Sequence, residues 1–228
     1  MKRFGLSNNQ LKLIALLTMT VDHIGAYLFP RVLILRIIGR IAYPIFAYMI
    51  AEGCFYTRKP GRYIGSMAIL AAVCQIVYFF FAGSLYMYIP VTFTLSIGLI
   101  FLLKKAMEKP SEKSFALFGL AVLGVLVITE MLPTVLGRWD FGVDYGFLGV
   151  MLPVMVYLGK NRWQKLGISA AMLLLLALRF TWVQYYGLLA LPFLALYNGQ
   201  RGKWKLKWLF YIYYPAHLAA IYLIGFLF

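Results

Sequence analysis

Long apolar runs, separated by short polar or basic segments, recur along the whole chain. Several reach the roughly 20 residues that a helix needs to cross a bilayer, and the shorter ones fit tilted, kinked or re-entrant helices. Because lipid offers no hydrogen-bond partners to an open backbone, runs of this length predict helices. The pattern therefore predicts an all-α, polytopic transmembrane helical bundle with about nine spans. The expected spans lie near 11–29, 41–57, 63–82, 91–103, 114–133, 145–158, 166–179, 183–197 and 208–227.

The basic residues predict how these spans are oriented. With a cytoplasmic N-terminus, seventeen of the 22 Lys and Arg residues fall in cytoplasmic segments, as the positive-inside rule requires, and the C-terminus lies outside. The net charge of +15 is then explained by loops beside anionic lipid headgroups, and no nucleic-acid partner is expected. The basic residues left on the outer side are Arg31, Arg36, Arg40, Arg138 and Arg179.

Composition narrows the class of protein further. Hydrophobic residues make up 63% of the chain and charged residues 13%, which excludes a soluble enzyme domain, a disordered chain and a disulfide scaffold. The first apolar run lacks a cleavage site after it, so we expect a retained span and not a signal peptide. Residues 1–228 are expected to form one integral membrane domain. The two cysteines have no histidine partners in motif spacing, so no disulfide and no metal site is expected.

Ionisable residues inside the spans are the informative ones, because burying them in a membrane is costly. His23 lies deep in the first span, and Lys12 lies eleven residues earlier, about three turns, on the same face. This face fits a cavity in which Lys12 meets an anionic group and His23 performs proton chemistry. Alternatively, Lys12 snorkels to the interface and His23 only forms an interhelical hydrogen bond. Asp22 lies about 100° around the helix, where it can orient another group or pair with an arginine.

The next polar pair is Arg36 and Arg40, which lie four residues apart and so share a helical face. One alternative is a short interfacial helix resting on the outer headgroups. The other is a pair of guanidiniums that bind phosphate or carboxylate, or that pair with Asp22 and Glu52. Pro44 is expected to kink the second span. Glu52 closes that span, where a solvated helix end is the alternative to a binding role.

The last span carries the second histidine, His217, near its middle. Tyr213 and Tyr214 precede it by four and three residues, so both can share its face. Pro215 frees a backbone carbonyl, which is typical beside a cavity or a polar neighbour. Two histidines deep in spans from the two ends of the chain predict a single polar centre.

An ordered set of motifs runs from residue 11 to residue 218 and carries a family resemblance. The motifs are Leu11-Lys12-Leu13-Ile14-Ala15 through Asp22-His23-Ile24-Gly25, Arg36 to Phe46, Ala51-Glu52-Gly53 with Thr57-Arg58, Tyr63, Asp144-Tyr145-Gly146 with Gly149, Tyr197-Asn198-Gly199 with Arg201-Gly202, and Phe210-Tyr211 with Tyr214 to Leu218. In these residues and this order the chain resembles the TraX family of integral membrane proteins.

The resemblance implies an acyltransferase of the bacterial inner (cytoplasmic) membrane. The family's namesake acetylates the amino terminus of a conjugative pilin subunit, with acetyl-CoA as the implied donor. The family is also similar to transmembrane acyltransferases that modify cell-surface sugars, whose first span carries the spacing found in Lys12-x10-His23. By resemblance, His23 is the catalytic histidine, as general base or as brief carrier of the acetyl group, and Asp22 supports it.

On this hypothesis, the acceptor is an amine or hydroxyl of an envelope protein or glycan. The basic inner loops attract the phosphates of acetyl-CoA. The residues expected to bind substrate are Lys12, Arg36, Arg40, Glu52, Tyr214 and His217.

Two other classes of protein remain open. A proton-coupled transporter or permease would use the same intramembrane groups as a relay, although no internal repeat is visible and acids are few. A non-catalytic assembly protein of an envelope or conjugation machine would need no polar centre, which leaves the two histidines unexplained.

Overall fold

The computed structural model describes residues 4–203 and 207–227 and divides the chain into two compact units. Unit 1 comprises Met1–Met49 and Gly159–Phe228, and unit 2 comprises Ile50–Leu158. The seventeen basic residues expected on the cytoplasmic side include Lys2, Arg3 and Lys205, which lie outside the described residues. Each unit is described by itself.

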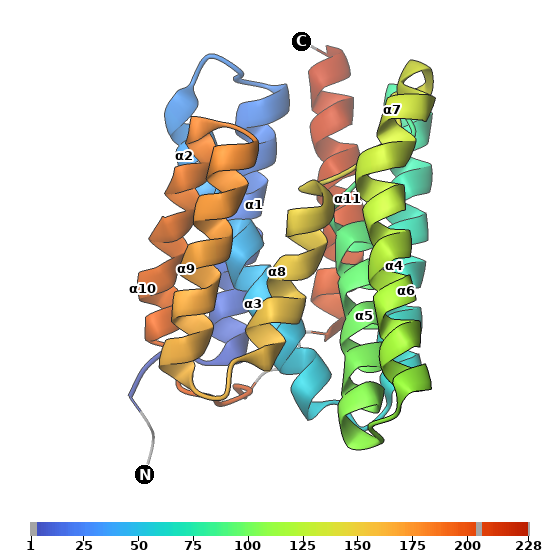
Figure 1. The fold of residues 1–228 in the computed structure, drawn as a ribbon. Helices are drawn as coiled ribbons and strands as arrows, with labels where there is room; N and C mark the ends of the chain where they lie inside the picture. The colour runs from blue at the N-terminus through green and yellow to red at the C-terminus, as the bar shows by residue number, and fades with distance from the viewer. Residues whose placement is uncertain (1–3, 204–206, 228) are drawn as a thin grey trace. The chain divides into compact units, whose positions relative to one another are not determined.

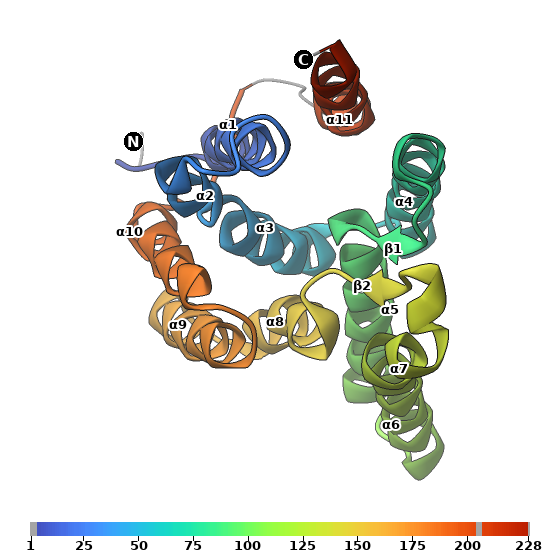
Figure 2. The same cartoon turned by 90° about the horizontal axis from the view of Figure 1, so that it is seen from above.

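Unit 1 consists of helices from both ends of the chain. They are α1 (Asn8–Tyr27), α2 (Leu33–Gly39), the first half of α3 (Ala42–Tyr56), α9 (Arg162–Arg179), the 3-10 helix η3 (Trp182–Leu189), α10 (Ala190–Ala195) and α11 (Lys207–Leu227). A capping box starts α1, because Ser7 and Gln10 each accept the other's backbone N–H with a side-chain oxygen. Helix α1 packs against both α2 and α11, which bring residues far apart in sequence side by side (Figure 2).

Unit 2 is also helical, with one short ladder of two parallel strands. It holds the end of α3, then α4 (Pro60–Ala82), β1 (Tyr86–Met87), α5 (Ile89–Glu108), α6 (Glu112–Leu126), the π-helix η1 (Val127–Met131), α7 (Leu132–Leu136), the 3-10 helix η2 (Gly137–Trp139), β2 (Gly142–Val143) and α8 (Gly146–Leu158). Helix α5 packs against α4, α6 and α8 (Figure 2). The Ser96 hydroxyl donates to the Val150 carbonyl at 2.8 Å and ties α5 to α8.

The helical bundle predicted from the sequence is confirmed, and each expected span coincides with helix in the described residues. By length and composition, five helical segments of the described chain are long and apolar enough to cross a membrane. They are Leu33–Tyr56, Pro60–Ala82, Ile89–Glu108, Glu112–Trp139 and Leu209–Leu227. The count of nine spans and the cytoplasmic N-terminus stay predictions.

The Leu33–Tyr56 segment is broken at Arg40 and Ile41, four and three residues before Pro44, which is where a proline distorts a helix. Pro44 itself lies in the first turn of α3, where the missing N–H leaves no intrahelical acceptor unpaired. One local alternative is wrong. Glu52 is not a solvated helix end, because α3 continues to Tyr56 and the residue is only 5% exposed. Glu52 belongs to unit 2, whereas the other predicted site residues belong to unit 1.

Candidate functional site

The two histidines form a buried pair between α1 and α11. Nδ1 of His23 lies 2.7 Å from Nε2 of His217, a hydrogen-bond distance, and the ring planes are tilted by 18°. The residues are 8% and 7% exposed. The single polar centre predicted from the two ends of the chain is therefore present in unit 1. We call His23 and His217 the histidine pair.

A backbone contact of His217 fixes which ring nitrogens carry protons. Nδ1 of His217 lies 2.9 Å from the carbonyl oxygen of Tyr213. Because a carbonyl oxygen only accepts, this nitrogen donates, and Nε2 of the neutral ring keeps a lone pair. That lone pair accepts the Nδ1–H of His23. Nε2 of His23 is then the unprotonated nitrogen of the pair, which is the atom that a general base needs.

Aromatic side chains hold the histidine pair in place. The Tyr213 ring stacks on His217 with 5.2 Å between centroids, and Tyr214 meets the same imidazole edge-on at 5.4 Å. The Tyr213 hydroxyl lies 2.8 Å from Oγ1 of Thr20, and that hydroxyl lies 2.9 Å from the Leu16 carbonyl. Since Thr20 donates to the carbonyl, Tyr213 donates to Thr20. The orientation of His217 is therefore fixed from both α1 and α11.

On another face of α1, Asp22 binds both arginines of α2. Nη2 of Arg40 lies 2.6 Å from each carboxylate oxygen, and Nη1 of Arg36 lies 2.8 Å from Oδ2. Arg36 also donates to the Asp22 carbonyl at 3.1 Å. Arg40 reaches further, to Oε1 of Gln184 on η3, at 3.4 Å. We call Asp22, Arg36 and Arg40 the Asp22 clamp; its geometry excludes the alternative in which both arginines rest on outer headgroups.

The Asp22 clamp requires α1 and α2 to approach closely, and glycines permit it. A Cβ atom on Gly39 would collide with the Asp22 side chain. One on Gly25 would lie 2.7 Å from the Cβ of Leu35, closer than real Cβ contacts. Small residues at such crossings are typical of membrane helix pairs.

We therefore expect Gly39→Ala to lower the stability of the protein by about 1–3 kcal/mol, since the added methyl group forces Asp22 and the arginines apart. Thermal unfolding of the purified protein in detergent measures the effect. Gly65→Ala on α4 is the matched control, because no atom beyond its own chain neighbours and helix backbone lies within 4 Å of its added Cβ. Equal unfolding temperatures for the two variants would contradict the close-approach argument.

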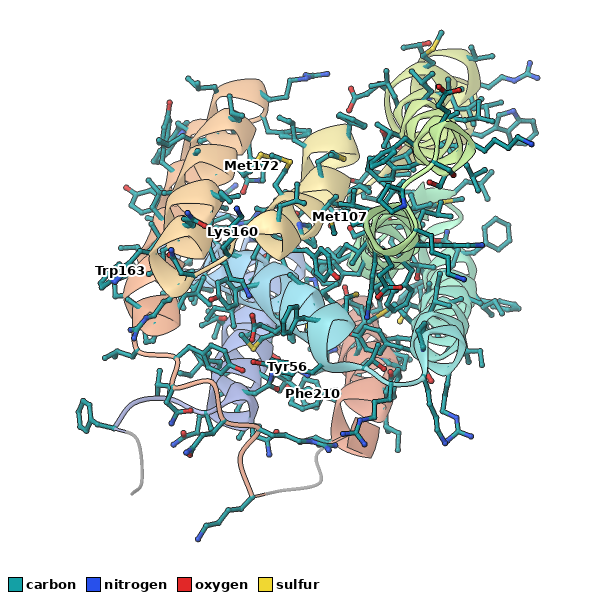
Figure 3. The ribbon with its side chains drawn as sticks, turned by 60° about the horizontal axis from the view of Figure 1, so that its bottom comes forward. Tyr56, Met107, Lys160, Trp163, Met172 and Phe210 are labelled. Atoms are coloured by element: carbon teal, nitrogen blue, oxygen red, sulfur yellow. The ribbon has the colours of Figure 1, made fainter. Side chains whose placement is uncertain are left out.

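Lys12 lies near the start of α1, whereas His23 lies near the end of the same helix. Its Nζ lies 5.9 Å from the centroid of the Phe210 ring on α11, within reach of a cation–π contact. Lys12 and His23 thus both face α11, as their spacing predicts. The beginnings of α1, α9 and α11 lie at the same end of unit 1 (Figure 1). Figure 3 shows Phe210 at this end together with Lys160 and Trp163.

Three residues of the site were not expected from the sequence. Thr20 lies three positions before His23 and so shares its face, a signal that could have revealed it. Gly39 and Gln184 offered no such signal, because their roles depend on contacts between separate helices. Within residues 4–203 and 207–227, no group of three or more His, Cys, Asp or Glu side chains is placed to hold a metal ion.

These features define a helical membrane protein with a buried histidine pair and a clamped carboxylate in one unit. The chain belongs to the TraX family, since the family model described as TraX protein matches residues 7–225. A probable fimbrial assembly protein (serogroup H1) of Dichelobacter nodosus is 25% identical over 242 residues, 93% of each chain. An uncharacterized protein of Rickettsia prowazekii (strain Madrid E) is 48% identical over 54 residues, 24% of this chain. The match spans 21% of that relative's length. No solved structure matches the chain.

Proposed function

We propose that this chain is a membrane-embedded acyltransferase that moves an acetyl group from acetyl-CoA to an amine or hydroxyl of an envelope acceptor. The observation that carries the proposal is the histidine pair, in which His23 presents an unprotonated Nε2 and His217 supports its other nitrogen. Group-transfer sites are commonly built from two side chains in hydrogen-bond contact, of which the second is oriented by a third group. Here the third group is the Tyr213 carbonyl.

In the proposed reaction, the acceptor nitrogen or oxygen attacks the thioester carbon of acetyl-CoA. Nε2 of His23 takes the proton that the acceptor loses, and the hydrogen bond to His217 spreads the resulting positive charge over two rings. As the new bond to the acetyl carbon forms, the carbon–sulfur bond breaks. The proton then passes from His23 to the departing thiolate, which leaves as CoA.

The other polar groups of unit 1 have supporting roles in this proposal. The Asp22 clamp carries two cations and one anion, and the Arg36 side chain keeps 32% of its surface exposed. The surplus positive charge of the Asp22 clamp stabilises the oxyanion that develops on the acetyl carbonyl, or it binds an acidic acceptor. Asp22 itself acts by positioning the arginines, because its carboxylate is engaged by both. Tyr214 packs against His217 in the wall of the site.

The family supports our proposals for the acceptor and the location. The relative from Dichelobacter nodosus is described as a probable fimbrial assembly protein, which favours a fimbrial or pilin-like subunit as acceptor over a glycan. We place the protein in the bacterial inner membrane with nine spans and a cytoplasmic N-terminus. This orientation exposes the Lys12 end of unit 1 to cytoplasmic acetyl-CoA.

A transfer assay on the reconstituted protein tests the proposal. We expect liposomes carrying the protein, supplied with acetyl-labelled acetyl-CoA and an envelope extract, to release CoA and label an acceptor. Liposomes without protein are the control for spontaneous hydrolysis. Proton-dependent solute flux without CoA release would contradict the enzyme and favour the transporter.

A further inference from the structure

The contact between α1 and α11 continues past the histidine pair. Tyr27 follows His23 by four residues on α1, and the centroids of their rings are 6.2 Å apart. The Tyr27 ring meets Tyr222 of α11 at 4.7 Å between centroids, with the planes tilted by 52°. A pair at this separation is in attractive aromatic contact. We call Tyr27 and Tyr222 the tyrosine layer; it lies next to the histidine pair, toward the C-termini of both helices.

The tyrosine layer lies where the α1–α11 contact reaches the surface. Because the contacts come in the same order on α1 and on α11, the two helices run in the same direction (Figure 1). Exposure increases toward their C-terminal ends. His23 and His217 are 8% and 7% exposed, whereas Tyr27 is 36% exposed and Phe29, two residues later, is 54% exposed. A molecule that approaches His23 from this end therefore meets the tyrosine layer first.

Uncharged residues surround the tyrosine layer on both helices. Residues 24–29, at the end of α1, include no acid and no base, and α11 has no acid, lysine or arginine after Lys207. The Asp22 clamp lies on another face of α1 and binds α2. Neither helix thus supplies a charged partner to the layer. Burying an ion there costs free energy, whereas an apolar side chain gains contact area with the rings.

We propose that the tyrosine layer is the acceptor-binding surface of the site, and that it selects a peptide whose N-terminal residue has an aromatic or large apolar side chain. The inference rests on the proposed acetyl transfer at His23. In such a peptide the reactive amine and the first side chain are joined to the same Cα atom. Tyr27 lies one helical turn, about 5.4 Å, from His23 along α1. The first side chain can therefore contact the Tyr27 ring while the amine contacts His23.

Two tripeptides that differ only in their first residue, phenylalanine or aspartate, test this selection. The measurement is kcat/KM for labelled-acetyl transfer to each peptide by the protein in nanodiscs, where both membrane faces are accessible. We expect the wild-type protein to prefer the phenylalanine peptide, and Tyr27→Ala to reduce this preference about 2- to 12-fold, the range of one aromatic contact. The preference is a ratio measured on one preparation, so it does not change if part of the variant fails to fold.

Three further variants show whether the rings themselves make the selection. Tyr27→Phe keeps the ring and should keep the preference, whereas Tyr222→Ala should lower it as Tyr27→Ala does. Tyr185→Ala is the matched control, because Tyr185 is a tyrosine of similar exposure, 40%, on η3. In every variant the KM for acetyl-CoA should stay at the wild-type value, since the proposed surface contacts the acceptor and not the donor.

The outcomes separate this proposal from the acyl transfer on which it rests. If Tyr27→Ala leaves the preference unchanged, or changes it no more than Tyr185→Ala does, the acceptor surface is wrong and the enzyme stands. Labelling of an envelope extract but of neither peptide would also overturn the surface, because the first side chain would then not decide recognition. If neither the peptides nor the extract is labelled and no CoA is released, the acyl transfer itself is wrong and the acceptor surface falls with it.

Discussion

Replacing His23 by asparagine is expected to reduce acetyl transfer by at least about 10²-fold, the lower limit of a typical general-base contribution, with the fold preserved. The asparagine side-chain amide can donate to Nε2 of His217 from nearly the position of the original Nδ1–H. The hydrogen bond that joins α1 to α11 is thereby kept. The lone pair that His23 presents at Nε2 is lost, so only the chemistry is removed.

Two measurements on the same preparation separate an effect on the chemistry from an effect on the fold. They are the rate of labelled-acetyl transfer and the unfolding temperature. His23→Leu is the matched comparison: it also removes the base, but it leaves Nε2 of His217 buried without a donor, which costs about 1–3 kcal/mol. We expect both variants to be inactive and only His23→Leu to be less stable. Near wild-type transfer by well-folded His23→Asn would refute the role of His23 as base.

The sequence predicted those parts of the site that lie along a single helix. The spacing of Lys12 and His23 placed both on one face, and the structure turns both toward α11. The spacing of Tyr213, Tyr214 and His217 likewise predicted their contacts. Helical periodicity is fixed by backbone geometry, so such relations follow from residue numbers alone.

Contacts between helices could be predicted only as alternatives. Asp22 and the arginines were candidates for pairing, but an interfacial helix satisfied the same sequence pattern. Gly39 decides between them, because its missing side chain lets α2 approach Asp22, and periodicity carries no information about that approach. Glu52 shows the same limit, since a polar residue near an expected span end gave no sign of its burial.

The second large effect concerns the Asp22 clamp, which couples α1 to α2 through charge. Asp22→Asn keeps the shape of the side chain but leaves Arg36 and Arg40 facing each other without a counter-charge. Breaking one partner of a buried ion pair costs roughly 3–5 kcal/mol. We expect the lower end of this range, because the Arg36 side chain is 32% exposed and water screens part of the repulsion. Thermal or denaturant unfolding in detergent measures the loss.

A double-mutant cycle tests whether this loss comes from the stranded cations. Arg40→Met removes the more buried arginine, whose side chain is 9% exposed, and by itself should also destabilise the protein. Combined with Asp22→Asn it removes the more buried of the two stranded cations and leaves only the partly exposed Arg36, so the double variant should be more stable than the sum of the single losses by about 0.5–3 kcal/mol. Glu112→Gln, at an exposed helix start, removes one acid for comparison and should change stability by less than about 0.5 kcal/mol. Strictly additive losses in the cycle would mean that Asp22 stabilises the α1–α2 pair through its backbone and shape, and not through its charge.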